Sequence, residues 1–120
     1  MTIIRSRAPL RLGLAGGGSD ISSFCDLHGG YVLNASIDRY AYATLEVTNT
    51  SKVVFHSADK NVIEELDCGS VVSLEETELP LHHAVYNRLI STYNNNNPIS
   101  MTLTTFCDAP PGSGLGSSST

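Results

Sequence analysis

The chain has 120 residues, a formal net charge of −5 and 41% apolar residues. This apolar content is enough for a packed core and lies far from the disordered range. Because there is no Lys/Arg cluster, the sequence excludes the usual electrostatic footprint for nucleic acid or an anionic membrane. The apolar runs are too short to cross a bilayer, and residues 1–7 lack the apolar stretch of a secretory signal.

The residues that could bind metal are scattered. Neither the three cysteines nor the four histidines show the spacing of a metal site. In a chain without a secretion signal, the cysteines indicate reduced thiols in a cytoplasmic protein. These residues are Cys25, Cys68, Cys107, His28, His56, His82 and His83.

The first thirty residues predict strand, loop and helix. Residues 3–14 are typical of two short strands with a break at Pro9, the second with an alternating apolar face of leucines. A helix is expected over residues 21–27, capped by Ser19 or Asp20 and ended by the glycines at 29–30.

Residues 31–47 give the clearest strand, with apolar and polar residues alternating along it and Arg39 as the exception on the apolar face. This run is long for one strand, so a bend or bulge is expected near Asp38 and Arg39. A strand over residues 52–56 follows a turn, and residues 62–66 form a candidate partner strand.

The last third predicts one helix and one strand. The helix is expected over residues 82–93, because apolar residues recur every fourth position along one stripe, with Tyr86 alongside it: Leu81, Val85, Leu89 and Tyr93. Asparagines and Pro98 end it, and residues 99–104 alternate as a strand. Short turns between adjacent strands favour antiparallel pairing, so an α+β fold is predicted over a doubly wound parallel sheet.

A glycine- and serine-rich loop follows that last strand and leads into the start of a helix. Alternating glycines let several backbone N–H groups turn toward one point, and such a nest at a helix N-terminus binds phosphate. The spacing fits neither a Walker A loop nor a dinucleotide fingerprint. The alternative is a flexible linker. The candidate phosphate-binding residues are Pro111, Gly112, Ser113, Gly114, Leu115, Gly116, Ser117 and Ser118.

An earlier glycine-rich loop lies between a strand and a helix. Its residues could bring a small polyol close to bare backbone, with the aspartate accepting hydroxyl hydrogen bonds; these are Gly16, Gly17, Gly18, Ser19 and Asp20. Alternatively, the glycines supply a turn and Asp20 caps the helix. Arg11, on the strand before this loop, could pair with a substrate phosphate or form a surface salt bridge with a carboxylate such as Asp20.

Together the two loops resemble the GHMP kinase superfamily. Residues 110–119 match its P-x-x-x-G-L-x-S-S-A motif except at the final alanine. Residues 7–20 resemble the first motif of the branch that phosphorylates D-glycero-D-manno-heptose 7-phosphate, with R-x-P-x-R followed by G-G-G-[ST]-D. The resemblance covers essentially the whole chain.

The resemblance implies a ribosomal protein S5 domain 2-like fold, with a mostly antiparallel sheet and helices on one face. It implies ATP and Mg²⁺ as cofactors, with residues 112–118 around the triphosphate and Ser118 near the metal. Residues 16–20 would hold the sugar, and Arg11 would lie near the reacting centre. For a substrate phosphate, the candidate cations are Arg5, Arg7, Arg11 and Arg39.

The family continues beyond the phosphate motif to a catalytic aspartate and a second glycine-rich motif. We therefore interpret residues 1–120 as the N-terminal ATP- and sugar-binding half of a sugar kinase, apparently truncated and inactive by itself. The expected partners are ATP and a sugar phosphate, without nucleic acid or membrane, and the oligomeric state is left open. The competing hypothesis is a non-catalytic sugar or nucleotide sensor, or an inactive fragment, of the same fold. S5-like domains also bind RNA, but the acidic charge argues against that role.

Overall fold

A computed structural model describes residues 2–70, 75–110 and 112–115. The chain divides into two compact units, the first formed by residues 1–6 and 42–106 and the second by residues 7–41 and 107–120. Each unit is described by itself below. Two long strands contribute to both units, and the five strands are hydrogen-bonded in the order β1-β2-β5-β3-β4.

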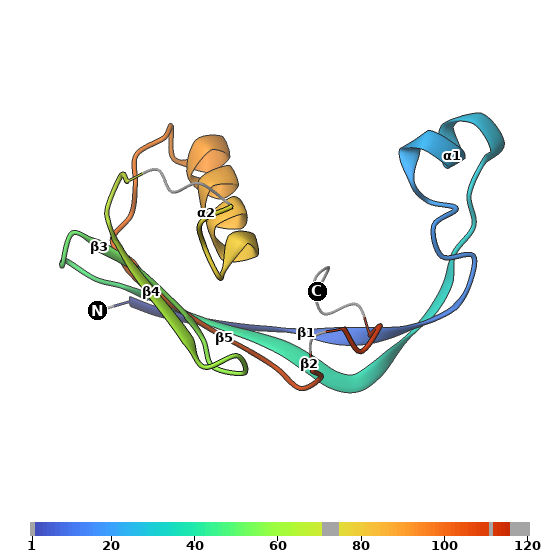
Figure 1. The fold of residues 1–120 in the computed structure, drawn as a ribbon, viewed down its shortest axis with the longest axis horizontal. Coiled ribbons are helices and arrows are strands. Elements are labelled where there is room, and N and C mark those ends of the chain that lie inside the picture. Colours follow the sequence, from blue (N-terminus) through green and yellow to red (C-terminus); the bar gives the residue numbers. More distant parts are fainter. Residues whose placement is uncertain (1, 71–74, 111, 116–120) are drawn as a thin grey trace. The chain divides into compact units, whose positions relative to one another are not determined.

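The structure confirms a mixed fold with one sheet and two helices (Figure 1). Most elements begin or end within two residues of the range predicted from the sequence. Their bounds are β1 (Thr2–Ala15), α1 (Ser22–His28), β2 (Leu33–Val47), β3 (Lys52–Ser57), β4 (Val62–Asp67), α2 (Pro80–Tyr93) and β5 (Met101–Cys107).

The expected break at Pro9 is wrong, since β1 continues through it as one strand of 14 residues. The reason lies in the strand order, which places β1 at an edge of the sheet. An edge strand needs only half of its N–H groups for pairing, so a proline there need not interrupt the ladder. The expected apolar face of alternating leucines is only partly buried. Leu10 is fully buried, whereas Leu12 and Leu14 are exposed.

In the first unit, β3 pairs with β4 as the predicted antiparallel hairpin, with Phe55 opposite Glu64. On its other side β3 pairs in parallel with β5, with Phe55 opposite Leu103. This pair departs from the antiparallel expectation. The chain between these two strands contains β4 and α2, which is the long connection that parallel pairing requires.

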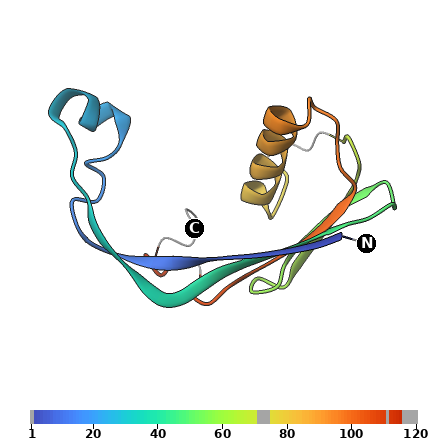
Figure 2. The same ribbon diagram turned by 180° about the vertical axis from the view of Figure 1, so that it is seen from behind.

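The core of the first unit forms between this sheet and α2. Its buried residues are Val53, Phe55, Leu79 and Met101. Both views show α2 lying across one face of the sheet segment that contains β3 and β5 (Figures 1 and 2). In the second unit, α1 lies beyond the ends of β1 and β2, at the tip of the ribbon that they form.

Tyr86, predicted alongside the apolar stripe of α2, packs against the core, but the stripe itself does not. The stripe of Leu81, Val85, Leu89 and Tyr93 is exposed, with Tyr93 at 79%. The side chain that α2 buries is His83. His83 and Tyr86 approach the Phe55 ring edge-on, at centroid distances of 4.8 and 5.8 Å. Aromatic packing against Phe55 therefore sets the orientation of this helix.

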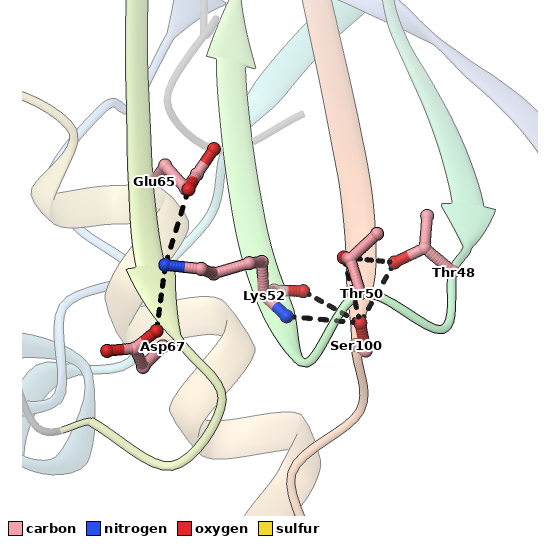
Figure 3. A network of polar contacts seen from close by, with 6 residues as sticks. All are labelled: Thr48, Thr50, Lys52, Glu65, Asp67 and Ser100. Atoms are coloured by element: carbon pink, nitrogen blue, oxygen red, sulfur yellow. Dashed lines mark hydrogen bonds and ion pairs between the residues drawn. The ribbon is translucent and has the colours of Figure 1, made fainter.

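A network of polar contacts fixes the turn that enters β3 (Figure 3). The Ser100 hydroxyl donates to the Lys52 carbonyl at 3.0 Å and lies 2.9 Å from the Thr48 hydroxyl. The Lys52 ammonium lies 2.8 Å from Asp67 and 3.4 Å from Glu65, across the hairpin. The hydrogen bond that Lys52 donates to Asp67 is the main cause that raises the pKa of Lys52. Because these charges are exposed, the ion pairs add little stability.

The cysteines Cys25, Cys68 and Cys107 are free thiols, in agreement with the sequence analysis. Within the described residues, neither helix combines the length and apolar character that spanning a lipid bilayer requires.

Candidate functional site

The first glycine-rich loop is a tight double turn between β1 and α1. Gly16 and Gly18 have positive φ angles of 78° and 88°. The Ser19 N–H donates to the Gly16 carbonyl at 3.0 Å, and the Ile21 N–H donates to the Gly18 carbonyl at 3.3 Å. Positive φ is readily adopted only by glycine, so the sequence of this loop follows from its path.

The loop is packed backbone-to-backbone against the segment that leads into β2. A Cβ on Gly16 would lie 1.9 Å from the Tyr31 carbonyl oxygen, and a Cβ on Gly30 would lie 2.0 Å from the Ser19 carbonyl oxygen. Neither approach leaves room for a side chain. The two glycines therefore hold the loop and the start of β2 together in the second unit.

The Ser19 hydroxyl fastens the same contact. It donates to the Gly16 carbonyl at 2.7 Å, and it lies 3.0 Å from the carbonyl and 3.1 Å from the N–H of Tyr31. This hydroxyl, predicted to contact substrate, is thus occupied in positioning the loop.

The predicted helix cap is wrong. The N-cap of α1 is Ile21, and no side chain caps the helix, whereas the end at Gly29 is as predicted. Asp20 instead lines a cavity. The explanation of Asp20 as a helix cap is therefore excluded, which leaves its carboxylate for another role.

The second glycine-rich loop begins where β5 leaves the sheet. Ala109 is buried, and the Ser113 N–H donates to the Pro110 carbonyl at 3.2 Å in a turn. Gly112 and Gly114 have φ angles of 78° and 74°. Of the predicted phosphate-binding residues, Pro111, Gly116, Ser117 and Ser118 lie outside the described residues.

The described part of this loop lies against β1. The Arg11 N–H donates to the Leu115 carbonyl at 3.0 Å. This backbone hydrogen bond connects the predicted phosphate loop to the strand that carries the predicted reacting-centre arginine. Both partners belong to the second unit.

The two loops share one cavity of about 250 Å³ in the second unit. It is lined by residues of β1, of both loops and of the start of β2, namely Arg11, Gly13, Gly17, Asp20, Val32, Asn34 and Gly114. The cavity thus brings together members of the predicted catalytic, nucleotide-binding and sugar-binding groups, whereas the predicted metal ligand Ser118 lies outside the described residues. A basic and an acidic residue, Arg11 and Asp20, border the same small space beside glycines of both loops.

Three of the lining residues were not predicted as site residues: Gly13, Val32 and Asn34. The sequence could have pointed to Asn34 because it lies on the polar face of the predicted strand. That face carries six other residues, so this feature alone does not single it out. Conversely, Gly16, Gly18 and Ser19 shape the first loop without lining the cavity.

Of the other candidate arginines, Arg7 stacks over the Tyr40 ring at 4.7 Å.

A second polar cluster lies in the first unit, at the start of α2. The Glu64 carboxylate accepts hydrogen bonds from the Thr77 hydroxyl and the Glu78 N–H, and it lies 2.7 Å from Nε2 of the buried His83. Burial acts to raise the pKa of Glu64, but the bonds from Thr77, His83 and Glu78 outweigh it, so the pKa lies below its ordinary value. These contacts tie β4 to the entry of α2.

The chain aligns over all 120 of its residues, at 42% identity, with D-glycero-alpha-D-manno-heptose 7-phosphate kinase of Campylobacter jejuni. The aligned residues are 35% of that kinase, so the chain spans about a third of its length. A crystal structure of a D-glycero-D-manno-heptose 1-phosphate kinase from Bacteroides thetaiotaomicron matches 98% of the chain with a TM-score of 0.84 and 44% identity, over 37% of its own chain. The resemblance to the GHMP kinases of the heptose branch is confirmed.

Other GHMP kinases share the fold at much lower identity. The mevalonate kinase of Methanococcus jannaschii matches 98% of the chain with a TM-score of 0.76 and 16% identity, over 36% of its own chain. At this identity the likeness concerns the fold alone. No protein-family model matches the chain.

Proposed function

We propose that the protein transfers the γ-phosphoryl group of ATP to a hydroxyl of a sugar phosphate, D-glycero-D-manno-heptose 7-phosphate. The observation that supports this proposal is the single cavity shared by Arg11, Asp20 and Gly114, which come from a strand and from both glycine-rich loops. We further assign the fold to the ribosomal protein S5 domain 2-like class and residues 1–120 to its ATP- and sugar-binding half.

Phosphoryl transfer depends mainly on positioning and on charge neutralisation. The bond between the γ-phosphorus and the bridging oxygen of ATP breaks and ADP leaves, a bond to the acceptor oxygen forms, and the acceptor hydroxyl passes its proton to a carboxylate base or to water. Exposed amides of the second loop and the Arg11 guanidinium would stabilise the negative charge on the transferred group. The Asp20 carboxylate would accept hydrogen bonds from sugar hydroxyls and so orient the acceptor.

Magnesium would accompany the nucleotide and neutralise part of its charge. No group of three or more His, Cys, Asp or Glu side chains in the described part of the chain could hold a metal by itself. This composition still fits Mg²⁺, which binds mainly through substrate phosphates and water with one or two protein oxygens. We expect the Ser118 hydroxyl to supply one of these oxygens.

The decisive experiment measures ATP turnover with a panel of acceptors. The panel contains heptose 7-phosphate, heptose 1-phosphate, galactose, fucose and mevalonate, with ADP release as the readout. We expect turnover with heptose 7-phosphate. Turnover with mevalonate alone would exclude the sugar assignment, and nucleotide binding without turnover on any acceptor would favour a sensor.

Variants test the site itself. Arg11→Gln should lower kcat/KM by about 100-fold or more, since it removes a charge placed to act on the transferred phosphoryl group. The matched control is Arg88→Gln, an exposed arginine on α2, which should leave turnover unchanged. Ser118→Ala should weaken Mg-ATP binding, and an unchanged affinity would count against the phosphate-loop assignment.

A further inference from the structure

Gly13 has no structural reason to be a glycine. It lies inside β1, its φ is not in the positive range, and a Cβ built on it would meet nothing within 4 Å. Glycine in a strand interior weakens the strand and often marks the close approach of a ligand. Gly16 and Gly30, by contrast, are required by backbone contacts. Since Gly13 lines the cavity, its missing side chain leaves space that a ligand could use.

Asn34 lies on β2, the strand next to β1, and lines the same cavity. Asparagine is disfavoured in strands, so a functional role is a reasonable explanation for its presence in β2. Its carboxamide makes no hydrogen bond to any residue that the structure describes. A carboxamide can donate two hydrogen bonds and accept two, which suits neighbouring hydroxyls that each donate and accept.

The charges of the lining residues indicate which part of a substrate each side of the cavity could bind. Arg11 and the backbone at Gly114 attract a phosphate, whereas the Asp20 carboxylate repels one and accepts hydrogen bonds from hydroxyls. A neutral amide at Asn34 adds hydrogen-bonding capacity without changing this balance. The polar atoms at Asn34 and Asp20 therefore fit the polyol part of an acceptor better than its phosphate.

We propose that Gly13 and Asn34 determine acceptor specificity. Asn34 would hydrogen-bond hydroxyls of the sugar, and the space above Gly13 would admit an acceptor with a longer carbon chain than a hexose. This inference rests on the proposed sugar kinase function and extends it by two residues that touch the acceptor rather than the nucleotide.

The test uses the intact protein and five variants. Asn34→Ala removes the carboxamide, and Gly13→Val fills the space with a residue that favours strands. The controls are Ser36→Ala, two residues further along β2, and Leu12→Val, the neighbour of Gly13 whose side chain is exposed and does not line the cavity. Thermal unfolding checks that each variant folds, with Gly13→Ala as the milder replacement. Calorimetry measures binding of heptose 7-phosphate, mannose 6-phosphate and ATP, and a coupled assay measures kcat and KM.

We expect Asn34→Ala to raise the KM and the dissociation constant for heptose 7-phosphate by about 10-fold, because a site group that pairs with a substrate hydroxyl contributes strongly to selection. Gly13→Val should weaken heptose 7-phosphate binding more than mannose 6-phosphate binding. ATP affinity should be unchanged in these variants. Both control variants should bind the two sugar phosphates and ATP as the wild type does.

Each outcome separates this inference from the proposed function. If the wild-type protein phosphorylates the heptose and both variants do so with unchanged KM, the inference is wrong while the function stands. If the wild type binds the heptose without turnover and the variants lose that binding, the inference stands and the kinase proposal fails. An effect on ATP alone, or no sugar binding by the wild type, overturns the inference.

Discussion

The carboxylate of Asp108 accepts a hydrogen bond from the backbone N–H of Tyr40 at 2.8 Å, and the Asp108 N–H donates to the Tyr40 carbonyl at 2.9 Å. Both backbone groups of one β2 residue are thus paired with one residue at the end of β5. A side-chain carboxylate thus accepts the bond from the Tyr40 N–H at the point where the chain turns into Ala109 and Pro110. Because proline has no N–H, the ladder could not continue there in any case.

Asp108→Ala should therefore misplace the second loop. We expect a loss of about 1 kcal/mol in the free energy of unfolding, because the Tyr40 N–H loses its partner, together with weaker ATP binding. Urea unfolding and calorimetry measure the two effects. Asp108→Asn keeps an acceptor and should restore most of both, whereas Asp38→Ala, an exposed aspartate on β2, should change neither. Unchanged ATP affinity in Asp108→Ala would show that this contact does not position the loop.

Two adjacent glycines of the first loop should respond differently to substitution by alanine. Gly16→Ala combines a φ of 78° with a Cβ placed 1.9 Å from the Tyr31 oxygen, so it should lower the free energy of unfolding by about 2 kcal/mol or more. Gly17→Ala meets nothing within 4 Å and should be nearly neutral for folding. Because Gly17 lines the cavity, its variant should instead weaken acceptor binding. Equal stability of the two variants, measured by thermal unfolding, would contradict this packing.

Ser19→Ala should loosen the first loop without removing a group that lines the cavity. The variant loses the hydroxyl that bridges Gly16 and Tyr31, for an expected loss of about 1 kcal/mol in stability. Hydrogen exchange at the Tyr31 amide should speed up, and acceptor KM should rise more than ATP KM. Ser23→Ala, on the neighbouring helix, serves as the control. A change in ATP KM alone would argue against this role.

Acid should destabilise the first unit through Glu64. Its pKa in the folded chain lies below the ordinary value of 4.5, so the folded state binds fewer protons than the unfolded state. Its stabilisation is therefore complete above about pH 5 and is lost as the pH falls through the folded pKa. Glu64→Gln should be less stable than the wild type at pH 7, by about 1 kcal/mol, with a difference that shrinks toward pH 3.

The matched control for this pH dependence is Glu65→Gln, because Glu65 is exposed and neighbours Glu64 on the same strand. Denaturant titrations between pH 3 and pH 7 give the comparison. His82 contributes in the same direction, since burial lowers its pKa and protonation at low pH therefore opposes folding. A Glu64→Gln variant whose deficit stays constant down to pH 3 would exclude this carboxylate as the titrating group.

The order of elements was predictable because it depends on local pattern. Alternation indicated β2 and β5, and Gly29 was correctly read as the end of α1. The face that α2 turns to the sheet was not predictable from its apolar stripe. His83 is buried instead of Leu81 because its ring packs against Phe55 and its Nε2 meets Glu64, and both partners lie far away in the sequence.

The sequence by itself determined the two glycine-rich loops and the resemblance to GHMP kinases, because these depend on residue types at fixed spacing. It also predicts phosphate and polyol binding at these loops. Only the tertiary structure decided that Ser19 fastens a loop, that Asp20 faces a cavity and that Gly13 and Asn34 line it. Adjacent residues of one loop point in different directions, and a cavity joins strands and loops that local spacing cannot relate. The roles of individual side chains therefore follow from contacts made across the chain.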